Sequence, residues 1–438
     1  MPFSSRRTLA GDPPTVSEPH ELGATDESLD RMLRWFQEYG DTYRVFAPAR
    51  NAWTWVVHHP DDVRRVLVAN HRNYTKGVGI DRVRMLLGNG IMTSEGEFWR
   101  RQRRMLQPAF HRRVIERYAG VIRERNAALL RQWAAAAATG SEVNLTHAMS
   151  GLALEVMLHA IFGADLDRLV GDLADNPFLL VTRESKRDPR FAFEFRQLGR
   201  VVQRIIRQRR ASGRRELDFT QMLMESVDPE TGQGMSERDL LDEILTLVVA
   251  GHETTASALN WTWWLLAQHP DVERRLQDEH DRVGDLGLAS YDDVARLPCT
   301  LAAIQESMRL YPPGWLLTRR SIGPDRLGGY AVPPGTDVFI SPYVVHRHPA
   351  IWDNAASFDP DRFGAGRSEG RHRFAYIPFA AGPRHCIGEN LATFEMLLHL
   401  NGALRRLRLR PVQAGPVALE ARINLRPARD MYMRVETR

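Results

Sequence analysis

The chain has 438 residues, and its 59 Lys and Arg against 54 Asp and Glu give a net charge of +5. A hydrophobic fraction of 43% and a charged fraction of 26% are those of an ordinary globular protein, and they exclude a disordered, collagen-like or coiled-coil chain. Only two cysteines are present, Cys299 and Cys386, which excludes a disulfide-stapled scaffold and a zinc site built mainly from thiolates. The length suits either several domains or one large fold.

The first twenty residues are polar and rich in Pro and Ser. They predict a flexible N-terminal segment over residues 1–20, without a secretory signal or a membrane anchor. The longest apolar stretch, residues 244–267, is interrupted by His252, Glu253 and Asn260, which argues against a membrane span. We therefore expect a cytoplasmic protein with reduced thiols.

Helical patterns dominate the chain, and strand-like segments lie toward its two ends. A hairpin is expected over residues 44–57, with strands on either side of residues 48–51. Helices are expected over residues 97–107, 113–138, 145–162, 191–210, part of 214–236, 236–269, 298–310 and 389–405. Further strand-like segments lie around residues 328–341 and 418–435. Because no clean boundary divides the chain, we predict a single domain over residues 21–438.

The longest predicted helix has clear signals at both ends. Ser236 can cap its start, and Glu237 and Asp239 place negative charge in the first turn, where it suits the helix dipole. Pro270 predicts its end. At about 1.5 Å per residue, this helix would be roughly 50 Å long.

Cys386 lies in the segment Phe-Ala-Ala-Gly-Pro-Arg-His-Cys-Ile-Gly, residues 379–388, just before the last predicted helix. Gly382 and Gly388 permit tight turns and close backbone approach. A thiolate before a helix N-terminus is stabilised by free N–H groups, and Arg384 adds positive charge nearby. The segment therefore favours a held, deprotonated sulfur that faces something bulky over a buried, inert cysteine.

This segment resembles the cytochrome P450 signature Phe-x-x-Gly-x-Arg-x-Cys-x-Gly at every fixed position. The resemblance implies a mainly α fold with small β-sheets, the single-domain triangular helical prism that encloses haem. It also implies that Cys386 ligates the iron of haem b, that Phe379 packs beside the sulfur, and that Arg384 pairs with a haem propionate. Gly388 belongs to the same cofactor-binding loop.

Two further segments match the family in its own order. Glu306 and Arg309 form a Glu-x-x-Arg pattern, and residues at i, i+3 on a helix can pair, although such pairs are common. Residues 358–363 resemble the segment that supplies a second arginine, here Arg362. The resemblance implies that Glu306, Arg309 and Arg362 form a structural triad that serves folding and haem incorporation, not chemistry.

Several arginines match propionate-binding positions of the family. Trp99 and Arg103 share one helix face and resemble its Trp-x-x-x-Arg pattern. Arg319 matches another such arginine, with Arg320 as the competing candidate, and a guanidinium suits a carboxylate because it donates in a planar fork. The other arginines of the basic stretch are expected mostly to face water: Arg100, Arg101, Arg104, Arg112 and Arg113.

One stripe of the longest helix consists mostly of small residues: Leu247, Ala250, Gly251, Thr254 and Ala258. Such a stripe leaves room for a flat cofactor and dioxygen, or it packs a core helix against a neighbour. Residues 250–255, Ala-Gly-His-Glu-Thr-Thr, resemble the acid–alcohol motif of the family. The resemblance implies that Ala250 and Gly251 contact the cofactor, and that Thr254 and Glu253 relay protons. It favours a monooxygenase over an isomerase or a peroxygenase.

The resemblance implies a haem-thiolate monooxygenase that inserts one oxygen atom from O2 into an apolar terpenoid, steroid or fatty-acid-like substrate. Desaturation or successive oxidations of the same substrate class are the alternative. Family substrate contacts correspond to Ile91, Leu247, Trp315, Leu316 and Leu317, and to segments 78–87, 178–181 and 423–425. Trp315 could equally be a core residue.

The partners follow from the same resemblance. We expect no fused reductase, so electrons would come from a separate ferredoxin and ferredoxin reductase. The basic surfaces around residues 100–113 and at Arg367, Arg371 and Arg373 would suit an acidic donor. The resemblance is to soluble, bacterial-type members, and we expect a monomer.

Two other classes of protein are disfavoured. A cysteine hydrolase would need Cys386 and the adjacent His385 to face each other, and neighbouring residues rarely do. Nucleic-acid binding through residues 204–215 is disfavoured because the basic runs are interleaved with acids and not with aromatics. Cys299 has no motif around it and is expected to be a buried small hydrophobic residue.

Overall fold

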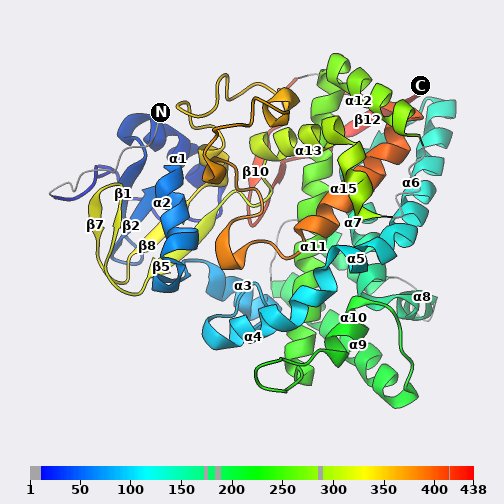
Figure 1. Cartoon of the computed structure of the whole chain (residues 1–438), viewed down its shortest axis with the longest axis horizontal. Helices are drawn as coiled ribbons and strands as arrows, with labels where there is room; N and C mark the ends of the chain where they lie inside the picture. Colours follow the sequence, from blue (N-terminus) through cyan, green and yellow to red (C-terminus); the bar gives the residue numbers. More distant parts are fainter. Residues whose placement is uncertain (1–10, 172–175, 183–188, 285–289, 414) are drawn as a thin grey trace. The chain divides into compact units, whose positions relative to one another are not determined.

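The computed structural model describes residues 11–171, 176–182, 189–284, 290–413 and 415–438 (Figure 1). The chain divides into two compact units, which are described separately. The first unit comprises Met1–Asp81, Gln305–Cys386 and Val417–Ala428, and the second comprises Arg82–Ile304, Ile387–Pro416 and Arg429–Arg438. Helices dominate and the sheets are small, which confirms the expected class of fold.

The first unit contains a five-stranded sheet in the order β1-β2-β8-β5-β3. Its strands are β1 (Thr42–Ala47), β2 (Ala52–Val57), β3 (Tyr74–Lys76), β5 (Leu317–Ser321) and β8 (Asp337–Ile340). β1 and β2 form the predicted hairpin, and β2 pairs in parallel with β8, so that Thr54 lies opposite Asp337. In Figure 1 the blue strands β1 and β2 therefore lie beside the yellow strands β5 and β8.

Short helices and two small hairpins complete the first unit. They are α1 (Asp26–Tyr39), α2 (Pro60–Arg64), α14 (Pro342–Val345), the pair β6 (Asp325–Leu327) and β7 (Tyr330–Val332), and the pair β10 (Leu419–Ala421) and β11 (Leu425–Pro427). α1 buries Leu29, Met32 and Trp35 in a cluster that also contains Val16. The Val16 N–H donates to the carbonyl of Arg44 at 2.9 Å. Of the predicted flexible segment, residues 1–10 lie outside the described part of the chain.

The second unit is mostly helical. Its elements are α3 (Ile80–Leu87), α4 (Gly96–Leu106), α5 (Arg112–Ile115), α6 (Ala119–Thr139), α7 (Leu145–Phe162), α8 (Ala164–Gly171), α9 (Pro189–Ser212), α10 (Phe219–Glu225), α11 (Glu237–Gln268), α12 (Pro270–Val283), α13 (Pro298–Leu310) and α15 (Glu389–Leu404). The first residues of α3 and the last of α13 belong to the first unit. A three-stranded sheet has the order β4-β12-β9, from Glu142–Asn144, Tyr432–Thr437 and Leu407–Pro411.

α11 is the longest helix of the described chain, and its predicted ends are confirmed. The Asp239 N–H donates to the Ser236 hydroxyl at 3.1 Å, and the Ser236 N–H donates to the Asp239 carboxylate at 3.2 Å. This reciprocal pair is a capping box. α11 packs against α7 and α15. α7 is long and apolar enough to cross a membrane by length and composition alone, but 61% of it is buried inside the structure, as in a core helix.

Four histidines are buried as neutral rings. Burial lowers the pKa of His58, His346 and His399 to about 3 and that of His280 to about 4. The hydrogen bonds of His399 require the neutral form, because its Nε2 accepts the Trp263 indole N–H at 2.9 Å. In the unfolded chain the same rings take up a proton below a pH of about 6.5.

These rings predict loss of stability in acid. The unfolded state binds more protons below pH 6.5, so each ring should lower the free energy of unfolding by about 1.4 kcal/mol per pH unit between pH 6.5 and its folded pKa. Urea unfolding at pH 7 and pH 5 measures this loss. His399→Gln should reduce the dependence on pH, whereas the control His147→Gln, at a side chain 73% exposed, should not. Equal slopes for the two variants would contradict the prediction.

Candidate functional site

The residues predicted for the site divide between the two units. The first unit holds Phe379, Arg384 and Cys386, together with Arg319 and the predicted triad. The second unit holds Trp99 and Arg103 and the whole of residues 250–254, and it also holds Gly388. Each group has a local geometry of its own.

Backbone bonds hold the cysteine loop of the first unit in a defined shape. The Cys386 N–H donates to the Phe379 carbonyl at 2.9 Å, and the His385 N–H donates to the Gly382 carbonyl at 2.9 Å. Gly382 has φ +73°, and a Cβ there would lie 2.0 Å from the Leu67 carbonyl oxygen, so the position admits only glycine. Cys386 is exposed and forms no disulfide. The loop therefore presents a thiol on a fixed backbone.

A buried ionic cluster lies in the same unit. The Arg309 guanidinium donates to the Glu306 carboxylate at 2.7 and 2.8 Å, and Arg362 Nε donates to it at 3.3 Å. Glu306 and Arg309 are 0% exposed and Arg362 is 4% exposed. The remaining Arg309 N–H groups donate to the backbone carbonyls of His346, Ala355 and Ser357, at 2.9, 2.8 and 3.1 Å. The structure thus brings the three residues of the predicted triad together.

His346 connects this cluster to the cysteine loop. Its Nδ1 donates to the Arg309 carbonyl at 3.3 Å, and its Nε2 accepts the Ile377 N–H at 2.8 Å, two residues before Phe379. The sequence analysis missed His346, because a single histidine without neighbours of its own kind gives no pattern. Its position just after the helical turn of α14 and its burial become visible only in the fold.

The structure distinguishes the two candidate propionate arginines. Neighbouring residues of a strand face opposite sides of the sheet. Arg320 donates to both oxygens of Asp337 at 2.9 Å, and its side chain is 49% exposed. Arg319 is buried, and the Gly77 backbone lies so close to it that a Cβ at Gly77 would be 2.7 Å from the backbone nitrogen of Arg319. Arg320 is thus bound to a carboxylate of the protein, whereas the Arg319 guanidinium donates to the Thr318 carbonyl at 2.8 Å.

In the second unit, α11 is buried from Asp242 to Ala267 except at one short stretch. Ala250, Gly251, Glu253 and Thr254 are half-buried and fall at i, i+1, i+3 and i+4, on one side of the helix. The Thr254 hydroxyl donates to the Ala250 carbonyl at 2.9 Å, which fixes its oxygen in this stretch. We call these four residues the α11 window.

Close packing against α7 also explains why residue 251 is a glycine. A Cβ at this position would lie 1.9 Å from the terminal methyl of Met157 on α7. The adjacent His252 is buried, and its Nε2 lies 3.1 Å from the Ser150 hydroxyl of α7. Close packing between helices, the alternative left open for this stripe, therefore applies on the α7 side of Gly251.

α4 places Trp99 and Arg103 on one side, as expected. Trp99 is 9% exposed, and the half-buried Arg103 donates through Nε to the Gln107 side chain at 2.9 Å. The expectation that Arg104 mostly faces water is wrong, since it donates to Asp228 at 2.8 Å and lies 2.9 Å from Glu230. The Arg104 hydrogen bond lowers the pKa of Asp228 to about 2.

Two more expectations are corrected, and one open choice is decided. Arg101 donates to the Gly234 carbonyl at 2.9 Å and does not simply face water. Cys299 is exposed rather than buried, because it lies in the first turn of α13, where its N–H donates to Glu279 at 2.7 Å. Trp315 is 0% exposed in the core of the first unit, and its indole N–H donates to the Arg422 carbonyl at 2.8 Å. The core alternative for Trp315 is thus favoured.

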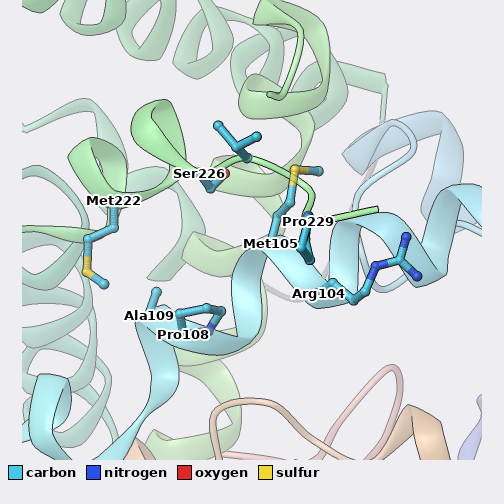
Figure 2. Close-up of a pocket in the computed structure, with 8 residues that line it drawn as sticks. Arg104, Met105, Pro108, Ala109, Met222, Ser226 and Pro229 are labelled. Carbon is cyan, nitrogen blue, oxygen red and sulfur yellow. The ribbon is translucent and has the colours of Figure 1, made fainter. Parts of the chain in front are cut away.

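The other predicted substrate contacts differ in burial. Leu247 is buried, whereas Ile91, Leu316 and Leu317 are half-buried. The second unit also contains a pocket of about 330 Å³, formed by the end of α4 and the turn after it, and by α10 and its following loop. Figure 2 shows the side chains that line it. It is lined by Arg104, Met105, Pro108, Ala109, Met222, Ser226, Val227 and Pro229. None of these residues was predicted for the site, and Arg104 is their one ionisable side chain.

A thiol on a rigid loop, backed by a buried ionic cluster, and a helix window that carries an acid and an alcohol define a haem-thiolate oxygenase. The family model for cytochrome P450 matches residues 14–428, and the chain belongs to this family. It is an oxidoreductase of the monooxygenase type, and the family implies a haem cofactor.

Named relatives and a solved structure agree with this assignment. Cyclooctatin synthase of Streptomyces melanosporofaciens is 35% identical and covers 84% of this chain and 83% of its own length. Cyclooctat-9-en-7-ol 5-monooxygenase of the same organism is 34% identical, with coverages of 85% and 83%. The crystal structure of the cytochrome P450DA heme domain matches at a TM-score of 0.86 and 25% identity, covering 99% of this chain and 98% of that one.

The residues present fit a haem. Cys386 is an accessible thiol, the kind of ligand that haem-thiolate proteins use, and Arg384 and Arg319 carry guanidinium groups, the kind of cation that binds a carboxylate. The α11 window is the part of a buried helix face that keeps accessible surface for a flat group. Sulfur donor, cations and small residues therefore match the chemistry of the cofactor.

The buried triad generates a stability prediction. Glu306→Ala would leave two buried guanidiniums without their carboxylate, so the free energy of unfolding should fall by about 3–5 kcal/mol. Glu97→Ala is the matched control, because it breaks the exposed i, i+3 pair with Arg100 and should cost less than about 1 kcal/mol. Urea unfolding measures both variants, and similar losses for the two would contradict a special role for the cluster.

Proposed function

We propose that this monooxygenase uses haem b, ligated by Cys386, to insert one oxygen atom from O2 into an apolar terpenoid, steroid or fatty-acid-like molecule. The cysteine loop carries the proposal, because its backbone bonds and Gly382 hold one accessible thiol in a fixed place. Haem, when bound, supplies the activation of dioxygen and the oxidation of the substrate. The chain supplies a ligand, protons and a shaped apolar site.

The remaining cofactor contacts follow from position and chemistry. Phe379 packs beside the sulfur, and Gly388 closes the loop before α15. Guanidinium and indole N–H groups bind the propionates, from Trp99, Arg103, Arg319 and Arg384. Ala250 and Gly251 contact the haem face through the α11 window, since the small Ala250 methyl and the bare backbone of Gly251 leave room for it.

Thr254 and Glu253 move protons to the site of dioxygen reduction. The Thr254 hydroxyl donates to the Ala250 carbonyl, which holds its oxygen at the window. When the hydroxyl turns away from the carbonyl it can give up its proton and take another from Glu253 or from water. Glu253 is half-buried on the same side of α11, where it can exchange protons with water. An acid next to an alcohol thus bridges solvent and the reaction site.

The substrate side is apolar. Leu247, Ile91, Leu316 and Leu317 are the proposed contacts, whereas Trp315 serves the core. One relative is named for oxygenation of cyclooctat-9-en-7-ol, an unsaturated alcohol with a single polar group. Cyclic terpenoids are therefore the first substrates to screen, by the change in haem spin state when water leaves the iron.

Electrons come from a separate ferredoxin and its reductase. An acidic donor would use the exposed Arg112 and Arg113, because Arg101 and Arg104 already bind the loop before α11. Arg371 is likewise engaged, since it donates to the Arg362 carbonyl at 2.6 Å. We propose a cytoplasmic monomer.

The cysteine assignment is tested with the two thiols of the chain. Cys386→Ser should abolish the absorption band that reduced, CO-bound haem-thiolate proteins show, because the soft sulfur ligand is lost. Cys299→Ser is the control, since this exposed thiol lies outside the loop, and it should keep the band. A wild-type protein that takes up no haem, or a Cys386→Ser variant that keeps the band, would refute the proposal.

The proton relay predicts a loss of coupling. Thr254→Ala should lower the product formed per O2 consumed by about tenfold or more and release hydrogen peroxide, because the positioned proton donor is gone. Thr255→Ala is the matched control, as this neighbour is buried and bonded to the Gly251 carbonyl at 3.1 Å. Oxygen uptake and product are measured together. Equal coupling in both variants would rule out a special role for Thr254.

A further inference from the structure

Two neighbouring acids of α11 bind the segment between α3 and α4 through its backbone. The Asn89 N–H donates to the Asp242 carboxylate at 2.7 Å, and the Ile91 N–H donates to the Glu243 carboxylate at 2.8 Å. The Gln102 side-chain amide of α4 donates to the other Glu243 oxygen at 3.0 Å. Both carboxylates thus hold main-chain groups of residues 88–94, which we call the clamped segment.

Two glycines allow this close approach. Gly88 has φ +69°, and a Cβ there would lie 2.3 Å from the Asp242 carboxylate. A Cβ at Gly90 would lie 2.2 Å from the Thr246 hydroxyl oxygen. The segment is also held internally, because the Thr93 hydroxyl donates to the Gly88 carbonyl at 2.7 Å. A preformed turn therefore rests directly on α11.

The clamp lies on the same face of α11 as the window. Glu243, Leu247, Ala250 and Thr254 fall at i, i+4, i+7 and i+11, which is one stripe of a helix. Glu243 and Ala250 are seven positions apart, or about 10 Å along the helix axis. Ile91, whose N–H Glu243 holds, is therefore fixed about two turns from the window, at one end of the small-residue stripe.

Burying the Glu243 carboxylate costs free energy of folding, which argues that the position of the clamped segment matters. Glu243 is 0% exposed, and burial raises its pKa to about 7, with Asp242 and Asp239 adding to the shift, while the Ile91 and Gln102 bonds oppose it. An apolar side chain would pack in such a place at lower cost. A buried carboxylate adds two directed hydrogen bonds that an apolar residue lacks.

We propose that Asp242 and Glu243 are positioning residues for the substrate: they fix the clamped segment so that Ile91 forms one wall of the substrate site. This inference rests on the proposed function, because Ile91 lines a site only if α11 faces the haem. The acids do not touch the substrate. They act through the backbone of residues 88–94.

Hydrogen–deuterium exchange of the haem-loaded full chain tests the clamp directly. In Glu243→Leu, the Ile91 amide should exchange about tenfold faster or more, because its N–H loses its acceptor, whereas the Asn89 N–H keeps its bond to Asp242. Glu243→Gln keeps a side-chain oxygen as acceptor and should restore most of the protection. Exchange in the rest of α11 should stay unchanged. Unchanged exchange of the Ile91 amide in Glu243→Leu would overturn the clamp.

Two iron-binding probes test the substrate wall. 1-Dodecylimidazole carries an apolar tail that reaches the wall, whereas imidazole binds iron without one. Glu243→Leu should lower the affinity for 1-dodecylimidazole about tenfold and change the affinity for imidazole by less than about twofold. Both affinities are measured by the shift of the haem absorption band. Equal affinity of both proteins for the long probe overturns the inference alone. A wild-type protein that binds neither probe overturns the proposed function as well.

Matched variants keep the test decisive. Gly90→Ala disturbs the clamped segment from its own side and should reproduce both effects, so it decides the outcome if Glu243→Leu does not fold. Asn126→Leu removes another buried polar group of the second unit, one bonded to the Ile122 carbonyl at 2.8 Å and to His399. Asn126→Leu should leave the affinities for both probes unchanged. A loss of long-probe affinity in Asn126→Leu equal to that in Glu243→Leu would show general destabilisation and overturn the proposal.

Discussion

The burial of Glu306 between two guanidiniums is the constraint on which the first unit depends. Three charged groups leave water only because each is paired and because carbonyl oxygens accept the remaining Arg309 protons. The His346 ring is bonded to the Arg309 carbonyl and to the Ile377 N–H, so it links the ionic cluster to the backbone just before the cysteine loop. The backbone around Cys386 is thus connected to an ionic core, for which a structural role was predicted from the sequence.

The second unit depends on α11 in a comparable way. The helix is buried over most of its length, yet it carries acids at its start, a half-buried acid and alcohol in the middle, and tryptophans toward its end. Each group meets a different element: the clamped segment at Asp242 and Glu243, α7 at Gly251, and α15 at Trp263 through His399. One helix therefore sets the spacing between the proposed substrate wall and the proton relay.

Sequence patterns predicted α4, α7, α11 and α15 closely, because each combines apolar periodicity with a recognisable end. α12 was missed since Pro270 was interpreted as an end, while it also serves as the first residue of the next helix. The pairing of Thr54 with Asp337 joins distant segments and has no local signal. A sequence motif predicted the candidate site residues around Cys386. No sequence pattern indicated His346 or Glu243, because their places in the structure depend on contacts that form only in the fold.

The contact between Gly251 and Met157 also limits how this enzyme can be redesigned. A side chain at position 251 would have to displace the flexible end of Met157, a residue 5% exposed, so its first effect would fall on the packing against α7. Ala250, on the same side of α11, is half-buried and so keeps accessible surface into which a larger side chain could extend. Within one motif, adjacent positions therefore differ in what a larger side chain would meet: the end of Met157 at position 251, and accessible surface at position 250.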